Sequence, residues 1–346
     1  MIALRKHAAT PGVELSEVPR PAPVLPTDVI VEVAATGICG SDLHIDEWFP
    51  DYAFLIPALP VTLGHEFSGR IVEVGAEVPP SAIGKRVVVK PSVACGVCIH
   101  CTAGDPDDCG VRVPIGLLRD GAFASAVRAP YGQCIEIPDG LDLVAAALAE
   151  PLTISEHAVQ DGDVGDGSRV LVFGPGTIGQ GAAVLARKAG ASEVVVVGYK
   201  DETRFDVLRK LGFDRLIDLA EPGGNERVLE AAGDGFDCVI EASGANAALE
   251  LGLQALRMRG VLVAVGIHGR NPSFDINKLV RRRLQIRGSY RASHAIWERV
   301  IGLLADDQAA FLPMITHRLP LEEALEGFRL GHRREASKVV LLPNSK

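Results

Sequence analysis

The hydrophobic pattern of the first 150 residues is one of short apolar runs bounded by Pro and Gly. DVIVEVAATGI (28–38), FSGRIVEVG (67–75) and GKRVVVKP (84–91) are three such runs. Short apolar runs between turn residues are typical of β-strands. This part of the chain therefore predicts a β-rich domain with few long helices.

From about residue 168 the pattern changes to strand-like runs that alternate with amphipathic helical runs. SRVLVFG (168–174) precedes a helical pattern over 177–190, and a helical pattern over 245–260 precedes a strand-like run over 260–266. LQIRGS (284–289) is the last predicted strand. This alternation predicts βαβ units, so we expect an α/β domain with a doubly wound parallel sheet covered on both faces.

The length of 346 residues favours two domains, because it exceeds what one ordinary core holds. Helix-like stretches and the strand-like KVVLLP (338–343) follow residue 290, and we assign this segment to the first domain. The expected boundaries are 1–155 with 290–346 for the β-rich domain, and 156–289 for the parallel-sheet domain.

The charge balance excludes some partners. The formal net charge is −9, and the one short basic cluster, Arg281 to Arg283, is too small for a nucleic-acid surface. No apolar run resembles a signal peptide or approaches the roughly 18 residues of a membrane span. We expect a cytoplasmic protein that acts on a small molecule, with neither nucleic acid nor membrane as a partner.

Four cysteines gather in one turn-rich stretch, Cys95, Cys98, Cys101 and Cys109. Their spacing lets four thiolates converge on one tetrahedral ion, which is typical of a closed structural zinc site. Two disulfides or an iron–sulfur cluster are the alternatives. Nothing else in the sequence indicates an oxidising compartment, so zinc is the preferred interpretation.

A glycine-rich loop follows the strand-like run that ends near residue 173 and opens a predicted helix. It reads Gly174, Pro175, Gly176, Thr177, Ile178 and Gly179. In G-x-G-x-x-G the glycines allow a tight turn, a close approach of backbone to pyrophosphate, and close packing of helix on strand. The motif alone is weak evidence, but its strand–turn–helix context predicts a dinucleotide site.

The end of the next predicted strand bears on which dinucleotide binds. An acidic residue there would hold the adenosine ribose of NAD. Gly198 and Lys200 stand there instead and Arg204 follows, so two cations are available for the 2′-phosphate of NADP. Asp201 and Glu202 could serve the ribose. The sequence leans toward NADP and leaves NAD open.

A second cluster with metal-binding character lies upstream of the four cysteines. Cys39, His65 and Glu66 offer a thiolate, an imidazole and a carboxylate. Three protein ligands with one open position are the arrangement of a catalytic zinc. Glu150 adds a further carboxylate just before the chain enters the second domain.

These motifs together resemble a known family. G-x-C-G-[ST]-D-x-H (37–44), G-H-E (64–66), the four-cysteine stretch, E-P-L (150–152) and G-x-G-x-x-G occur in one order over essentially the whole chain. The chain is similar to the zinc-containing medium-chain dehydrogenase/reductases, above all to their polyol (sorbitol) and L-threonine 3-dehydrogenase branch. The resemblance implies a GroES-like catalytic domain, a Rossmann domain and two zinc ions per subunit.

The resemblance also implies roles for individual residues. Cys39, His65 and Glu66 would lie at the catalytic zinc, with Glu150 as a direct or water-mediated ligand and Asp42 orienting His65. Glu66 beside the zinc, rather than on it, is the alternative. The four cysteines between residues 95 and 109 would hold the structural zinc.

The implied chemistry is alcohol oxidation. Zinc would act as a Lewis acid on a substrate hydroxyl while hydride passes to the nicotinamide. Ser41, the cofactor ribose and His44 would relay the released proton to solvent, since imidazole titrates near neutral pH. The alternatives are that Ser41 is a turn hydroxyl and His44 a surface histidine.

Three functions compete at this point. The first is a polyol or sugar-alcohol dehydrogenase. The second is an L-threonine 3-dehydrogenase-type oxidation of an amino alcohol. The stretch FPDYAFLIPALP (49–60) places it in doubt, because it differs from the pattern expected of the threonine dehydrogenases. The third is a crystallin-like protein that binds NAD(P)H without catalysis. By resemblance we also expect a homo-oligomer, a dimer or a tetramer.

Overall fold

The computed structural model describes residues 1–344, which divide into two compact units. The first comprises Met1–Glu150, Ser293–Gln308 and the segment from Ile315 onward. The second comprises Pro151–Ala292 and Ala309–Met314. Each unit is described here by itself.

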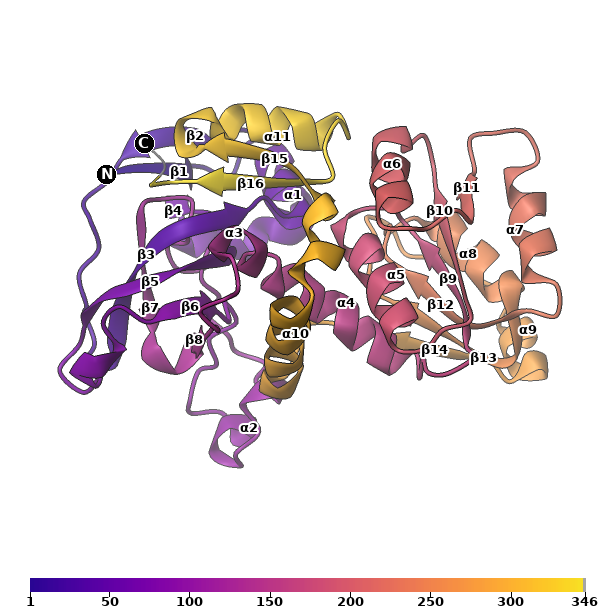
Figure 1. Cartoon of the computed structure of the whole chain (residues 1–346), viewed down its shortest axis with the longest axis horizontal. Coiled ribbons are helices and arrows are strands. Elements are labelled where there is room, and N and C mark those ends of the chain that lie inside the picture. Colours follow the sequence, from indigo (N-terminus) through magenta and orange to yellow (C-terminus); the bar gives the residue numbers. More distant parts are fainter. Residues whose placement is uncertain (345–346) are drawn as a thin grey trace. The chain divides into compact units, whose positions relative to one another are not determined.

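The first unit consists mainly of β-strands (Figure 1). One sheet has the order β2-β1-β4, and a larger one has the order β15-β16-β3-β5-β6-β8, with β7 also paired to β3. The strands are β1 (Ile2–Lys6), β2 (Glu14–Glu17), β3 (Asp28–Gly37), β4 (Val61–Thr62), β5 (Glu66–Val74), β6 (Arg86–Val89), β7 (Ala126–Pro130), β8 (Cys134–Glu136), β15 (Ile315–Pro320) and β16 (Lys338–Leu342).

The helices of this unit are few and mostly short. They are α1 (Gly40–Glu47), α2 (Ile99–Thr102), α3 (Leu143–Ala146), α10 (His294–Asp306) and α11 (Ala324–His332), and α4 (Ala149–Asp161) begins where the unit ends. β3 is central, because it pairs with β5, β7 and β16. Val29, Val31 and Val33 of β3 share a buried cluster with Phe67 and Ile71 of β5.

The second unit contains a six-stranded parallel sheet of order β11-β10-β9-β12-β13-β14. Its strands are β9 (Arg169–Phe173), β10 (Glu193–Gly198), β11 (Leu216–Asp218), β12 (Phe236–Glu241), β13 (Leu256–Ala264) and β14 (Gln285–Gly288). Its further helices are α5 (Thr177–Lys188), α6 (Glu202–Lys210), α7 (Gly224–Ala232), α8 (Asn246–Ala255) and α9 (Ile276–Arg282), and they lie on both sides of the sheet (Figure 1).

The strand order reverses between β9 and β12, which are neighbours in the sheet. In open parallel sheets a ligand binds outside the carboxyl ends of the strands at such a reversal. Leu171, Phe173, Val239 and Leu262 form part of the buried core beneath this point. The prediction of a β-rich unit and a doubly wound parallel sheet is confirmed.

One predicted helix is too long. The helical pattern over 245–260 forms α8 only to Ala255, and Leu256 already pairs with Phe236 as the first residue of β13. An irregularity in the register between Phe236 and Cys238 admits the additional residues, and Arg257 forms an ion pair with Asp237 of β12. The polar positions between residues 256 and 260 are compatible with the repeat of a helix and with that of a strand, so the sequence pattern did not reveal that the helix ends early.

Among residues 1–344 no helix has the length and apolar character needed to cross a membrane.

Candidate active site and metal centres

Cys39, His65 and Glu66 come together because β3 and β5 are antiparallel. Gly37 at the end of β3 pairs with Glu66 at the start of β5, so residues just after β3 meet residues that open β5. Cys39 stands immediately before α1 as its N-cap. One ligand atom from each of these three side chains lies within 4.8 Å of the others. A thiol, an imidazole and a carboxylate at this spacing fit a zinc ion.

Glu66 is also held by a lysine that the sequence analysis missed. Lys338, at the start of β16, donates from Nζ to both carboxylate oxygens of Glu66 (2.6 and 3.0 Å) and to the carbonyl of Ile38 (2.8 Å). Both charged side chains are almost fully buried. Burial acts to lower the pKa of Lys338, but Glu66 and its other anionic neighbours raise it, so the lysine is charged. No local motif marks Lys338, because its partner is far away in the sequence.

Asp42 lies behind His65. The Cys39 N–H donates to Asp42 Oδ2 (2.9 Å), which fixes the carboxylate at the first turn of α1. Asp42 Oδ1 is 3.6 Å from His65 Nδ1, and both atoms are buried without a hydrogen bond. With a metal bound at Nε2 of His65, the ring proton would lie on Nδ1, and this N–H would face the Asp42 carboxylate. These two orphaned atoms are a second observation that fits a metal at the cluster.

Glu150 lies in the first turn of α4. Burial raises the pKa of Glu150 to about 7, while the charge of His65 lowers it and that of Glu66 raises it. Its carboxyl therefore lies within electrostatic range of the cluster, although it is not among the three side chains whose ligand atoms converge.

The two predicted relay residues have different surroundings. The Ser41 hydroxyl lies 3.4 Å from His65 Nε2. The ring of His44 stacks on Phe49 with a centroid separation of 4.6 Å, and burial lowers the pKa of His44. His44 is therefore neutral near pH 7 and able to accept a proton. A link between the two side chains would require a third group, such as the cofactor ribose that the sequence analysis invoked.

The four cysteines between residues 95 and 109 also converge, with ligand atoms within 4.8 Å of one another. Backbone amides point at the sulfurs: Cys98 N–H donates to Cys95 Sγ (3.3 Å), and Cys95 N–H donates to Cys109 Sγ (3.4 Å). The latter bond lowers the pKa of Cys109 to about 6. Amide donors favour thiolates, so this cluster fits a closed four-thiolate zinc site.

The glycine-rich loop joins β9 to α5. Gly174 has φ of +95° and Gly176 is the N-cap of α5. A Cβ on Gly179 would lie 1.8 Å from the Gly174 carbonyl oxygen, so the third glycine is needed for packing, whereas one on Gly176 would meet nothing within 4 Å. The open space at Gly176 and the amide end of α5, which includes Thr177 and Ile178, fit a pyrophosphate.

The end of β10 carries the predicted coenzyme determinants. A side chain at Gly198 would collide with Phe205 and Pro175, so no acid can replace this glycine without rearrangement. Lys200 follows on an exposed turn with φ of +53°. Arg204 forms an ion pair with Asp201 (3.2 Å), which itself is buried. The acid that could have served a ribose is thus engaged by an arginine.

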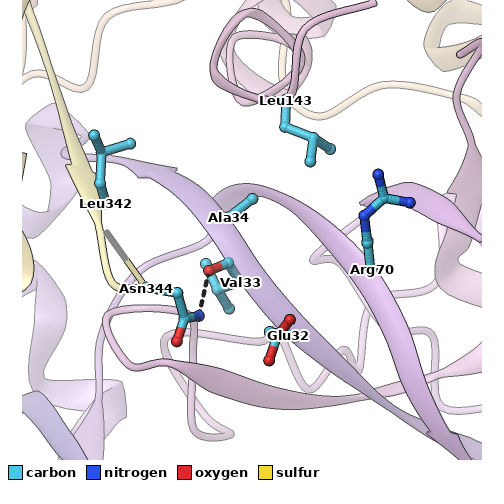
Figure 2. Close-up of a pocket in the computed structure, with 7 residues that line it drawn as sticks. All are labelled: Glu32, Val33, Ala34, Arg70, Leu143, Leu342 and Asn344. Carbon is cyan, nitrogen blue, oxygen red and sulfur yellow. Dashed lines mark hydrogen bonds between the residues drawn. The ribbon is translucent and has the colours of Figure 1, made fainter. Parts of the chain in front are cut away.

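A separate pocket of about 270 Å³ opens in the first unit (Figure 2). It is lined by Glu32, Val33, Ala34, Arg70, Leu143, Leu342 and Asn344. Asn344 donates from Nδ2 to the Val33 carbonyl (2.8 Å) at one side of it. None of the predicted site residues lines this pocket.

Comparisons with known proteins agree with the class that this fold and these clusters define. Residues 25–139 match the alcohol dehydrogenase GroES-like domain family, and residues 177–306 match the zinc-binding dehydrogenase family. A sorbitol dehydrogenase of Halalkalibacterium halodurans is 34% identical over 95% of both chains, and an L-threonine 3-dehydrogenase of a Marinomonas species is 32% identical over 99% of both. A zinc-binding dehydrogenase of Sinorhizobium meliloti, solved with NADP, is 31% identical with a TM-score of 0.86 over 99% of both chains.

The chain belongs to the zinc-containing medium-chain dehydrogenase/reductases, with a GroES-like unit and a Rossmann-like unit. It is an oxidoreductase of the alcohol and polyol dehydrogenase type. The predicted family, fold and enzyme class are confirmed.

Proposed function

We propose that this enzyme oxidises a secondary hydroxyl of a polyol or sugar-derived alcohol, with hydride transfer to NAD(P)⁺. The observation that carries the proposal is the convergence of Cys39 with the buried His65 and Glu66 in the unit that matches the alcohol dehydrogenase family. Residues 1–155 with 290–346 would hold both zinc ions, and residues 156–289 would bind the dinucleotide.

When bound, the zinc ion supplies the Lewis acidity that activates a substrate hydroxyl, and the nicotinamide accepts the hydride. Cys39 and His65 would bind the metal, with Glu66 and Glu150 supplying carboxylates next to it. The pairing of Glu66 with Lys338 favours Glu66 as the carboxylate that stays beside the metal, because its charge is already balanced. Glu150 would then be the exchangeable ligand.

The proton of the substrate hydroxyl would leave by way of Ser41, the cofactor ribose and His44. The Ser41 hydroxyl lies 3.4 Å from His65 Nε2, the nitrogen that would bind the metal, so this hydroxyl would receive that proton first. His44, held neutral by burial, is the terminal acceptor. Both roles follow from the position of α1, which starts at Gly40 and carries the two side chains in its first two turns.

NADP is the proposed coenzyme in preference to NAD. Lys200 would meet the 2′-phosphate directly, and Arg204 would reach it from a position that Asp201 already fixes. The similar chain from Sinorhizobium meliloti, solved with NADP, supports this choice.

L-Threonine is the second candidate substrate, because L-threonine 3-dehydrogenases match the chain over 99% of its length. The alternative of a crystallin-like protein that binds cofactor without turnover has no supporting observation of its own.

Initial rates of NAD⁺ and NADP⁺ reduction by the zinc-loaded protein test these proposals. The panel comprises polyols, sugar-derived alcohols and L-threonine, with a simple secondary alcohol as the reference. We expect the highest kcat/KM on a polyol with NADP⁺. A higher value on L-threonine than on any polyol would transfer the assignment to the amino alcohol. Tight NAD(P)H binding without turnover on the whole panel would contradict the catalytic proposal.

A further inference from the structure

The four cysteines lie in the segment 90–112, which we call the four-cysteine lobe. Arg112 is a buried cation of this lobe and lies three residues after Cys109. Only 8% of it is exposed. Its guanidinium donates to four backbone carbonyls: those of Cys109 (3.1 Å), Ser92 (2.9 Å), Asp107 (2.6 Å) and Pro106. One side chain thus ties together both ends of the segment that carries the cysteines.

The charge of Arg112 has no carboxylate partner among residues 1–344. The other buried cation of the lobe, Lys90, differs in this respect, because its Nζ lies 2.6 Å from Asp107 Oδ1. Carbonyl dipoles solvate a guanidinium but do not cancel its charge, and a buried charge without compensation is strongly unfavourable. The structure therefore requires a source of negative charge close to Arg112.

The four cysteines are such a source when they hold a metal. One Zn²⁺ with four thiolates has a net charge of −2. The bond from Arg112 Nε to the Cys109 carbonyl places the guanidinium at the backbone of one ligand residue. The lobe has no surplus of other cations, since Asp105, Asp107 and Asp108 lie in the same segment.

We propose that Arg112 is the charge partner of the four-cysteine site, which offsets the negative charge of the metal–thiolate centre and fixes the chain from Pro106 to Cys109 around it. The proposal rests on the proposed zinc in this lobe. Arg112 is thus a positioning residue, which would act on the metal through its charge and through the backbone that carries the cysteines. Groups that contact metal ligands change metal affinity by roughly 10- to 100-fold when removed.

The test measures the rate at which zinc passes from the protein to a chromophoric chelator. The parent protein in this test is the full-length Cys39→Ser variant. It lacks the thiolate of the cluster of Cys39, His65 and Glu66, so the zinc that is released comes from the four-cysteine lobe. Arg112→Gln keeps donors but removes the charge, and Arg112→Lys keeps the charge but removes the planar fork. The double variant Lys90→Gln/Asp107→Asn is the matched control, because it removes a buried cation together with the carboxylate that balances it and leaves the net charge of the lobe unchanged.

We expect Arg112→Gln to release zinc about 10- to 100-fold faster than its parent, with Arg112→Lys and the Lys90→Gln/Asp107→Asn double variant within a few-fold of the parent. Release from Arg112→Gln at the parental rate would overturn the proposal, as would equally fast release from Arg112→Lys and Arg112→Gln. A parent that holds no zinc in the lobe would overturn the underlying zinc assignment as well, which separates the two failures.

A second variant keeps the test decisive if Arg112→Gln does not fold. Asp107→Asn leaves the charge of Lys90 unbalanced and so adds positive charge near the thiolates. Charge compensation predicts slower zinc release from this variant. Faster release would contradict it.

Discussion

The four-cysteine lobe and the Cys39 cluster are both candidate zinc sites, yet they are assembled in different ways. The lobe takes all four ligands from one stretch, Cys95 to Cys109, and is tied by Arg112 to backbone carbonyls. The Cys39 cluster takes its three groups from Cys39, which follows β3, and from His65 and Glu66 at the start of β5. Lys338 of β16 pairs with Glu66, and Glu150 in the first turn of α4 lies nearby.

This difference separates a structural site from a reactive one. A uniform set of four thiolates saturates a tetrahedral ion and leaves no position for substrate. The Cys39 cluster offers a thiol, an imidazole and carboxylates, one of which, Glu66, is already paired with Lys338. Such a set leaves a coordination position open for a substrate. The mixed cluster also contains the groups with shifted pKa values, Asp42, His65 and Glu150, which is typical of reactive sites.

The largest effect is expected from Cys39→Ser. Loss of this thiolate removes a metal ligand, so we expect no measurable alcohol oxidation while the thermal unfolding midpoint stays close to that of the parent. Initial rates and differential scanning calorimetry measure the two quantities. Full activity in Cys39→Ser would contradict the assignment of the reactive cluster.

Cys98→Ser addresses the other side of the comparison. We expect the thermal midpoint to fall by roughly 5 °C or more, because each kcal/mol lost lowers it by roughly 2–4 °C in a domain of this size. Residual activity at low temperature should remain, since no reacting group is changed. An unchanged midpoint would show that the lobe does not stabilise the fold.

His44→Asn tests the proposed proton route. Below the lowered pKa of His44 the imidazole is protonated and cannot accept the substrate proton, so the parental oxidation rate should fall as the pH drops below that pKa, which lies under the ordinary histidine value. We expect the variant to lose this acidic limb and to be slower at neutral pH by on the order of 10²-fold, the lower end for proton-transfer groups. A pH profile that keeps its parental shape would remove His44 from the route.

Asp42→Asn tests whether the carboxylate behind His65 orients it. We expect kcat/KM to fall by roughly 10- to 100-fold, with zinc bound more weakly. Asp46→Asn, on the same helix but paired with His332 at the surface, is the matched control and should retain near-parental values. Equal effects of the two substitutions would assign the loss to α1 as a whole.

Lys200→Ala gives the smallest expected effect. Losing one exposed charge pair costs about 1 kcal/mol, which corresponds to about fivefold in KM for NADP⁺. KM for NAD⁺ should not rise. A parallel change for both coenzymes would show that Lys200 does not contact the 2′-phosphate.

The fold was largely predictable because its signals are local. β9 was predicted within residues 168–174 and spans Arg169–Phe173, since a continuous apolar run bounded by turns has one interpretation in an alternating α/β pattern. The end of α8 was not predictable, because the pairing of Leu256 with Phe236 depends on a distant strand.

The sites follow the same division. The stretch from Cys95 to Cys109 and the loop from Gly174 to Gly179 were recognisable, because the spacing of these residues along the chain determines how they lie together in the fold. Lys338 and Arg112 were not, since each gains its meaning from contacts that only the folded chain brings together. The choice between Glu66 and Glu150 as ligand depends on that same long-range contact of Lys338.

The most direct test of the account is the zinc content of the parent, Cys39→Ser and Cys98→Ser, measured by native mass spectrometry alongside the oxidation rate. The account predicts two zinc ions in the parent and one in each variant, with turnover lost in Cys39→Ser and retained at low temperature in Cys98→Ser. Turnover that depends on the zinc of the four-cysteine lobe, and survives the loss of the other, would contradict it.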